Sequence, residues 1–460
     1  MAGGGVAQDD QVAGRRPDPR AIALVLTFAA MGVTSAAFPA SLPATAARLG
    51  DSPARLLPGI SVLFGGLLAG VLVVSALRPR TAPRLLAAGA VLQGAALLGL
   101  AATPDITGFY LACAVAGVGF GLAEASGSAL ARQLAAERTT AALAGLNGAA
   151  AVSAAACPLI VAAAAPGSLP LALGLLLLIP LASGGLAVWA WPVPRADPAG
   201  PGAKAASGTG PARPGAKPAP GTGPVQPDAQ AVPGVEPAPS AAKAVPGVDP
   251  GRRRVPPGPA GLRRALGRVL PGGTLLFLFV GTETVFSGWS SVLPLEVLRL
   301  SPRTAALGTS AFWALMAAGR YLAAALLRRG VPPGRYLIVG LAAAAADLAV
   351  AAGIGSSAPG VELALAALAT ASLAPGYALI LGQVLAHVDS DAVQRVTGVL
   401  VAAGAAGGSL IPLAVALGAG AAVPALLLTQ AGLLLACAAL AGRPGTWRAG
   451  NAATEARLDR

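Results

Sequence analysis

Apolar residues occur along this chain in runs of about twenty, separated by short segments that carry most of the charges. A helix of that length crosses the hydrocarbon core of a bilayer, because each residue adds about 1.5 Å along a core about 30 Å thick. The pattern predicts an all-α membrane protein with twelve transmembrane helices. The predicted spans are 21–42, 57–77, 83–103, 108–131, 140–165, 169–191, 271–295, 305–327, 334–354, 361–386, 395–418 and 421–442.

The predicted spans form two sets of six, 21–191 and 271–442, joined by the segment 192–270. That segment is rich in Pro, Gly, Ala and basic residues, and it contains a repeat of 13 residues that starts at Gly202 and again at Gly215. Such a composition cannot bury a core. We therefore expect a disordered cytoplasmic linker, with cytoplasmic tails at 1–20 and 443–460.

The two sets repeat each other in sequence. FPASLPATAARL, which starts at Phe38, parallels WSSVLPLEVLRL, which starts at Trp289, and Pro158 parallels Pro412 further on. Six-span halves repeated in parallel are the layout of major facilitator transporters, which hold their solute between the halves near the bilayer midplane.

Basic residues are distributed unevenly over the connecting segments. If the N-terminus is cytoplasmic, 27 of the 32 Lys and Arg lie on the cytoplasmic side. The outer segments hold only Arg48, Arg55, Arg299 and Arg303, and Arg320 lies within a span. This asymmetry follows the positive-inside rule and predicts an inner-membrane protein with both termini in the cytoplasm.

Composition narrows the class further. The chain has 55% hydrophobic and 11% charged residues, which is typical of a membrane protein with many spans. We therefore interpret the net charge of +13 as basic residues that set the membrane topology, and not as a nucleic-acid-binding surface. Cys113, Cys157 and Cys437 lie in apolar spans without metal-ligand spacing. No catalytic or nucleotide-binding motif is recognisable, so we expect neither an enzyme nor a cofactor, and energy would come from an ion or solute gradient.

The seventh predicted span carries a carboxylate near its middle. Burying a charged side chain in hydrocarbon costs about 3 kcal/mol or more, so Glu283 should face the protein interior or a hydrated cavity. Ser287, Ser290 and Pro294 share its helix face. This polar stripe on an apolar span predicts a solute or proton pathway, although an acid can also fasten helices together.

Four segments resemble the fucose:proton symporter branch of the major facilitator superfamily. They are VGTETVFSGW (280–289), FWALMAAGRYL (312–322), GVGFGLAEASGSAL (117–130) and LPATAARLG (42–50). The resemblance implies the major facilitator fold, two pseudo-symmetric six-helix bundles. It also favours a sugar or sugar-like solute.

Single residues follow from this resemblance, and so do departures from it. Glu124 occupies the family's acidic position in span four, and Ser128 stands where the family often has Asn. Arg320 is placed toward the cytoplasmic half of span eight, as a gate or in an ion pair. Where the fucose branch has a second carboxylate in span one, this chain has Pro39, so Glu283 would stand in for it. The segment 155–162 lacks the antiporter signature of span five.

Other polar residues complete the candidate site. Glu124 shares a face with Gly117 and Gly121, which leaves room for solute or water, or else packs on another helix. Asp347 and His387 are the remaining titratable candidates, with structural or interfacial roles favoured. The predicted cavity-lining residues are Thr34, Ser128, Asn147, Ser287, Trp289, Tyr377 and Gln383.

The sequence thus predicts a proton-coupled secondary transporter, expected to be a monomer, which moves a small polar solute by alternating access. Glu124 and Glu283 are the expected proton-coupling or solute-binding groups. Two alternatives stay open: proton-driven efflux of a drug or natural product, and a non-transporting sensor or scaffold that uses the segment 192–270 as a tether.

Overall fold

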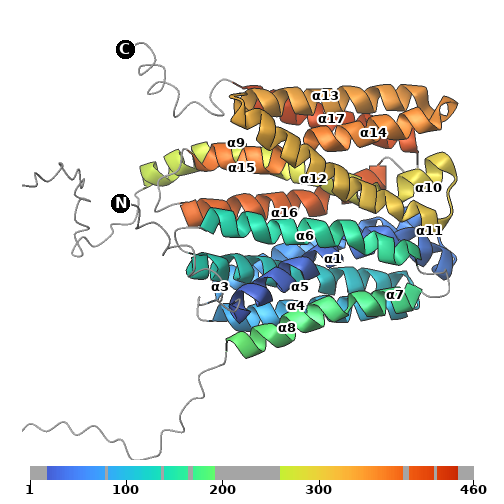
Figure 1. The fold of residues 1–460 in the computed structure, drawn as a ribbon. Helices are drawn as coiled ribbons and strands as arrows, with labels where there is room; N and C mark the ends of the chain where they lie inside the picture. Colours follow the sequence, from blue (N-terminus) through green and yellow to red (C-terminus); the bar gives the residue numbers. More distant parts are fainter. Residues whose placement is uncertain are drawn as a thin grey trace, which may run out of the picture. The chain divides into compact units, whose positions relative to one another are not determined.

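The computed structural model describes residues 18–77, 81–135, 139–163, 169–191, 259–386, 393–418 and 422–443. Apart from the first residues of α9, they belong to one compact unit, and their regular elements are helices (Figure 1). The first half contains α1 (Pro19–Leu49), α2 (Pro53–Leu56), α3 (Pro58–Ala76), α4 (Ala82–Ala102), α5 (Ile106–Ala135), α6 (Thr139–Ala163), α7 (Leu169–Leu176) and α8 (Leu178–Ala190).

The second half contains a similar series. Its members are α9 (Pro259–Trp289), α10 (Val292–Leu298), α11 (Pro302–Ala305), α12 (Leu307–Arg328), α13 (Pro333–Ile354), the 3₁₀ turn η4 (Gly355–Ser357), α14 (Pro359–Leu373), α15 (Gly376–Leu385), α16 (Val393–Gly418) and α17 (Val423–Gly442).

Twelve stretches of the described chain are long and apolar enough to cross a membrane, which confirms the predicted number. One boundary differs: α9 begins at Pro259, inside the segment 192–270 that was expected to be a linker. The part 259–270 lacks the repeat and reads PAGLRRALGRVL, whose Leu, Ala and Arg residues favour a helix that continues into the span. The expected tails and the rest of the linker lie outside the described residues.

Proline and glycine set the ends of several helices. Proline occupies one of the first two positions of α1, α3 and α4, where its missing N–H has no helical partner to lose. Asp18 caps α1 through a 2.9 Å hydrogen bond that it accepts from the Arg20 amide, and α1 ends at Gly50 with a φ of 67°. Local chemistry therefore determines these boundaries.

Within the first half, glycines bring helix backbones into contact. Gly117 and Gly121 of α5 pack on the backbone carbonyls of Leu63 and Leu67 in α3. A side chain at either glycine would overlap those carbonyls, so the close approach requires glycine. Of the two uses considered for this glycine face, the structure shows helix packing.

The two halves are connected at one end of the bundle, near the end of α1 and the start of α12. The hydrogen bonds there between described residues are Ser291 Oγ to the Pro39 carbonyl (2.5 Å), Ser310 Oγ to Ala155 (2.9 Å), Ser409 Oγ to Ser61 (2.9 Å) and Arg303 to the carbonyls of Ala162 and Ala163. We call this end, where α10 and α11 lie in Figure 1, the joined end.

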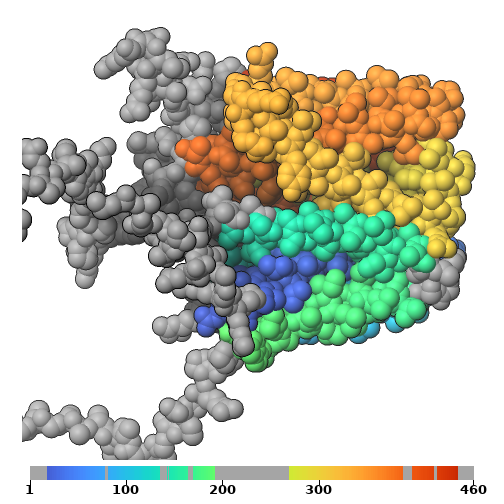
Figure 2. Space-filling model, viewed as in Figure 1, coloured from blue at the N-terminus to red at the C-terminus, as the bar shows by residue number. Residues whose placement is uncertain are grey.

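Apolar packing at the joined end also crosses between the halves. Phe38 and Leu42 of α1 belong to the same buried cluster as Trp289 of α9 and Leu293 of α10. The surfaces of α6 and α12 lie against each other along this part of the molecule (Figure 2). The joined end is therefore closed by a continuous core and by hydrogen bonds.

One of these hydrogen bonds uses a carbonyl left without a helical donor by proline. Pro43 has no N–H, so the Pro39 carbonyl, one turn earlier in α1, cannot form its usual helical bond. Ser291 of the other half donates to that carbonyl instead. The bond satisfies a buried acceptor that would otherwise be unpaired.

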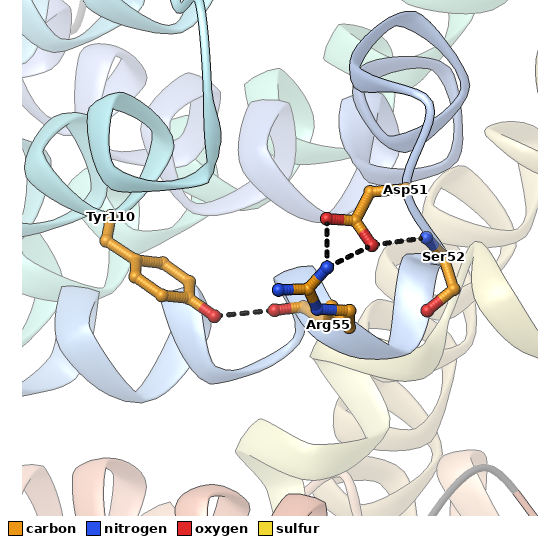
Figure 3. A network of polar contacts seen from close by, with 4 residues as sticks. All are labelled: Asp51, Ser52, Arg55 and Tyr110. Carbon is orange, nitrogen blue, oxygen red and sulfur yellow. Dashed lines mark hydrogen bonds and ion pairs between the residues drawn. The ribbon is translucent and has the colours of Figure 1, made fainter.

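The turn from α1 to α3 is held by a small polar network (Figure 3). Asp51 accepts from the Ser52 amide (2.9 Å) and forms an ion pair with Arg55 (2.9 Å), while Tyr110 Oη donates to the Arg55 carbonyl (2.5 Å). A groove of about 460 Å³ lies beside it, lined partly by Arg55, Tyr110 and Ala416. Because Tyr110 belongs to α5, the network fixes this turn to another helix of the same half.

Candidate functional site

An ion pair lies between α9 and α12, away from the joined end. Arg320 Nη2 is 3.7 Å from Glu283 Oε1, and the two side chains are 42% and 18% exposed. The separation is long for a hydrogen-bonded pair, and solvent screens it partly. The pair is therefore weak enough for either partner to exchange it for a solute or a proton.

Arg320 also contacts a break in the tenth span. Its Nε donates to the Ala374 carbonyl at 3.2 Å, in the short connection between α14 and α15. Pro375 interrupts this span and leaves the Ala371 carbonyl without its helical donor. Gly319 packs on that carbonyl so closely that a side chain would overlap it. Broken helices with accessible carbonyls are a common feature of solute sites in transporters.

Tyr377, at the start of α15, lies in the neighbourhood of the carboxylates of both halves. Its hydroxyl is close enough to Glu124 of α5 and Glu283 of α9 for their charges to act on it, although no hydrogen bond joins it to either acid among the described residues. Gly376 positions this turn by packing against the ring of Phe279. Three of the predicted site residues, from three helices, thus share one polar region.

The two carboxylates differ in their partners. Glu124 is half-buried and forms no hydrogen bond or ion pair with another described residue. Glu283, also half-buried, has Arg320. Ser128 lies one turn from Glu124 and Ser287 one turn from Glu283, and both are half-buried. The arrangement offers one unpaired acid, one paired acid and several hydroxyl groups.

Of the other predicted cavity residues, Thr34 and Trp289 lie in packed interiors. Thr34 is fully buried and donates to Gln93 of α4 at 2.8 Å, so its hydroxyl joins two helices of one half. Trp289 is 4% exposed within the core of the joined end. Asn147 is exposed on α6, and Gln383 lies beside Gly334 at the start of α13. Helical periodicity predicts which residues share one face of a helix. It does not predict which other helix packs against that face.

Two titratable candidates and one missed residue complete the description. Asp347 is half-buried on α13, and His387 lies outside the described residues. Trp313 of α12 is half-buried, packs against two large buried clusters, one of which spans both halves, and stands two turns from Arg320. Trp313 entered the prediction from sequence only within the segment 312–322, and its spacing of seven residues from Arg320 is the signal that was available.

Twelve spans, two halves joined at one end and charged groups between them define the class of secondary transporters. Residues 20–412 match the family model of the Major Facilitator Superfamily, and the chain belongs to that family. No curated protein matches the sequence.

Solved structures share the fold at low sequence identity. A D-xylose–proton symporter aligns with a TM-score of 0.66 and 13% identity, covering 93% of this chain and 98% of that one. The nucleoside transporter NupG (D323A mutant) aligns with 0.61 and 10%, covering 92% and 98%. A bacterial homolog of the human lysosomal transporter Spinster, in an inward-facing and occupied conformation, aligns with 0.59 and 11%, covering 93% and 97%.

Proposed function

We propose that this protein is a proton-coupled transporter of a small polar, sugar-like solute and works by alternating access. The observation that carries the proposal is the polar region formed by Glu124, Tyr377, Glu283 and Arg320, which draws on both halves. Rocking of the halves changes the surroundings of all four groups at once. The sugar and nucleoside transporters among the similar folds support the solute class.

Glu124 is the proton carrier in this proposal. A carboxylate in a dry environment favours its neutral form, and hydration favours the charged form, so access from alternate sides loads and releases a proton. Glu124 has no cation beside it among the described residues that would hold it in the charged form. Tyr377 offers a hydroxyl that can bind solute or relay the proton.

Glu283 and Arg320 form the solute-responsive part of the site. A hydroxyl-bearing solute that reaches them can accept from the guanidinium and donate to the carboxylate. While no solute is bound, the ion pair leaves neither charge without a partner. Solute binding then alters the Arg320 contact with the Ala374 carbonyl, and this couples the site to the break between α14 and α15.

The distribution of basic residues supports an orientation with α1 starting at the cytoplasm, in the inner membrane. In this orientation the joined end faces outward and is closed. The Ser291 and Arg303 hydrogen bonds between the halves must break when the outer side opens.

The test is solute-driven proton movement in proteoliposomes, with a panel of sugars, nucleosides and cationic drugs. We expect Glu124→Gln to abolish coupled proton flux. Asp347→Asn is the matched control, because α13 packs on α14, α15 and α17 of its own half. Uncoupled solute flux in the wild type, or full coupling in Glu124→Gln, would contradict the proposal. A response to cationic drugs alone would favour the alternative function, proton-driven efflux of a drug, over transport of a sugar-like solute.

A further inference from the structure

One face of α12 points between α9 and the opposite half. Thr309 Oγ1 lies 2.8 Å from Ser290 Oγ at the end of α9, whereas Ser310 donates to Ala155 of α6. Successive helical residues turn by about 100°, so Trp313 and Arg320 are about 20° apart and lie between those two directions. Trp313 therefore stands on the same inward face as Arg320, about 10 Å nearer the joined end.

The indole N–H of Trp313 is buried and has no hydrogen-bond partner. The ring is half-buried, packs edge-on against Phe312 with centroids 5.4 Å apart, and borders two large buried clusters, one of which spans both halves. An unpaired N–H in such a place is costly, and tryptophan N–H groups usually find an acceptor when buried. A function in binding would explain why the N–H of Trp313 is left without a partner.

The repeat of the two halves offers a comparison for this residue. Gly59, Phe64 and Gly70 of α3 align with Gly308, Trp313 and Gly319 of α12. Phe64 packs across to the other half, against Gly408 of α16. Packing between the halves is thus achieved at the equivalent position by an aromatic ring without a donor. Compared with Phe64, Trp313 carries an N–H group that packing does not require.

We propose that Trp313 is a recognition residue for the solute, with its ring stacking on a sugar-like ring and its N–H donating to a solute oxygen. The proposal requires a rotation about χ2 that turns the buried N–H edge toward the solute. The inference rests on the proposed function and narrows the solute to ring compounds with an acceptor oxygen, such as pentoses, hexoses and nucleosides. Arg320 and Glu283 lie on the side of Trp313 away from the joined end and would contact the rest of the solute.

The experiment is equilibrium binding of radiolabelled D-xylose, D-glucose and uridine to the purified full chain, followed by the deoxy analogues of the compound that binds. Trp313→Phe keeps an aromatic ring and removes the N–H. Trp189→Phe is the matched control, since Trp189 is 68% exposed on α8. Thermal unfolding of each variant verifies that it is folded.

We expect Trp313→Phe to weaken binding about tenfold, the usual effect of an unpaired partner, with Trp189→Phe unchanged. One deoxy analogue should lose a similar factor in the wild type and nothing further in Trp313→Phe. Unchanged binding by Trp313→Phe, or additive losses for every analogue, overturns the proposal. If Trp313→Phe does not fold, the analogue series measured on the wild type is sufficient to test the proposal. Absence of binding by all three probes also overturns the proposal. Binding without proton flux would instead refute the proposed transport function.

Discussion

The first half of the bundle presents an acid without a partner, and the second half presents an acid with one. Glu124 forms no ion pair with a described residue, while Glu283 lies 3.7 Å from Arg320. Both interact electrostatically with Tyr377. The difference indicates different roles for the two acids. An unpaired acid can take up a proton without affecting another charge, whereas a paired acid that takes up a proton leaves its cation without a partner.

The sharpest test of this difference separates exchange from accumulation. We expect Glu124→Gln to retain solute exchange across the membrane and to lose accumulation against a gradient, because a neutral amide can bind solute but carries no proton. Glu283→Gln should reduce both by roughly 100-fold, since it removes a carboxylate that binds the solute in this proposal and also leaves Arg320 without its partner. Counterflow and gradient-driven uptake in proteoliposomes measure the two activities. Equal losses of both activities in the two variants would remove the distinction.

A second test concerns the ion pair itself. Arg320→Gln should lower exchange about tenfold, a smaller effect than for a dry pair because the Arg320 side chain is 42% exposed. The double variant Arg320→Gln with Glu283→Gln should recover part of the loss, as no unpaired charge remains. Initial exchange rates of the four proteins give the coupling. Strictly additive losses would show that the pair does not act as a unit.

The smallest expected effect lies at the joined end. Ser291→Ala removes the donor to the Pro39 carbonyl, and one such bond contributes about 1 kcal/mol, or roughly fivefold in an equilibrium. The population with an open joined end should rise by that factor, as measured by spin-label distances across the halves. Ser301→Ala is a control, because the Ser301 hydroxyl contacts only its own turn at Thr304. Equal populations in both variants would show that this bond does not hold the end closed.

Local properties of the sequence predicted most of the fold. The length and polarity of each apolar run are visible without knowing its neighbours, so the twelve spans followed directly. Glu124 and Glu283 were recognisable for the same reason, because an acid within an apolar run is unusual wherever the run packs. The start of α9 at Pro259 was missed, since a basic composition resembles a linker until the helix is seen.

The choice of neighbours was decided by tertiary structure alone. Trp289 and Trp313 are both tryptophans near polar stripes, yet Trp289 is enclosed at the joined end, whereas Trp313 is half-buried on the face of α12 that also carries Arg320. Thr34 is a plausible cavity hydroxyl until Gln93 is found next to it. A helical period tells which residues share a face, whereas the partner of that face depends on how the helices pack. The sequence alone therefore determined the spans and the two acids, and packing between helices determined which polar groups meet them.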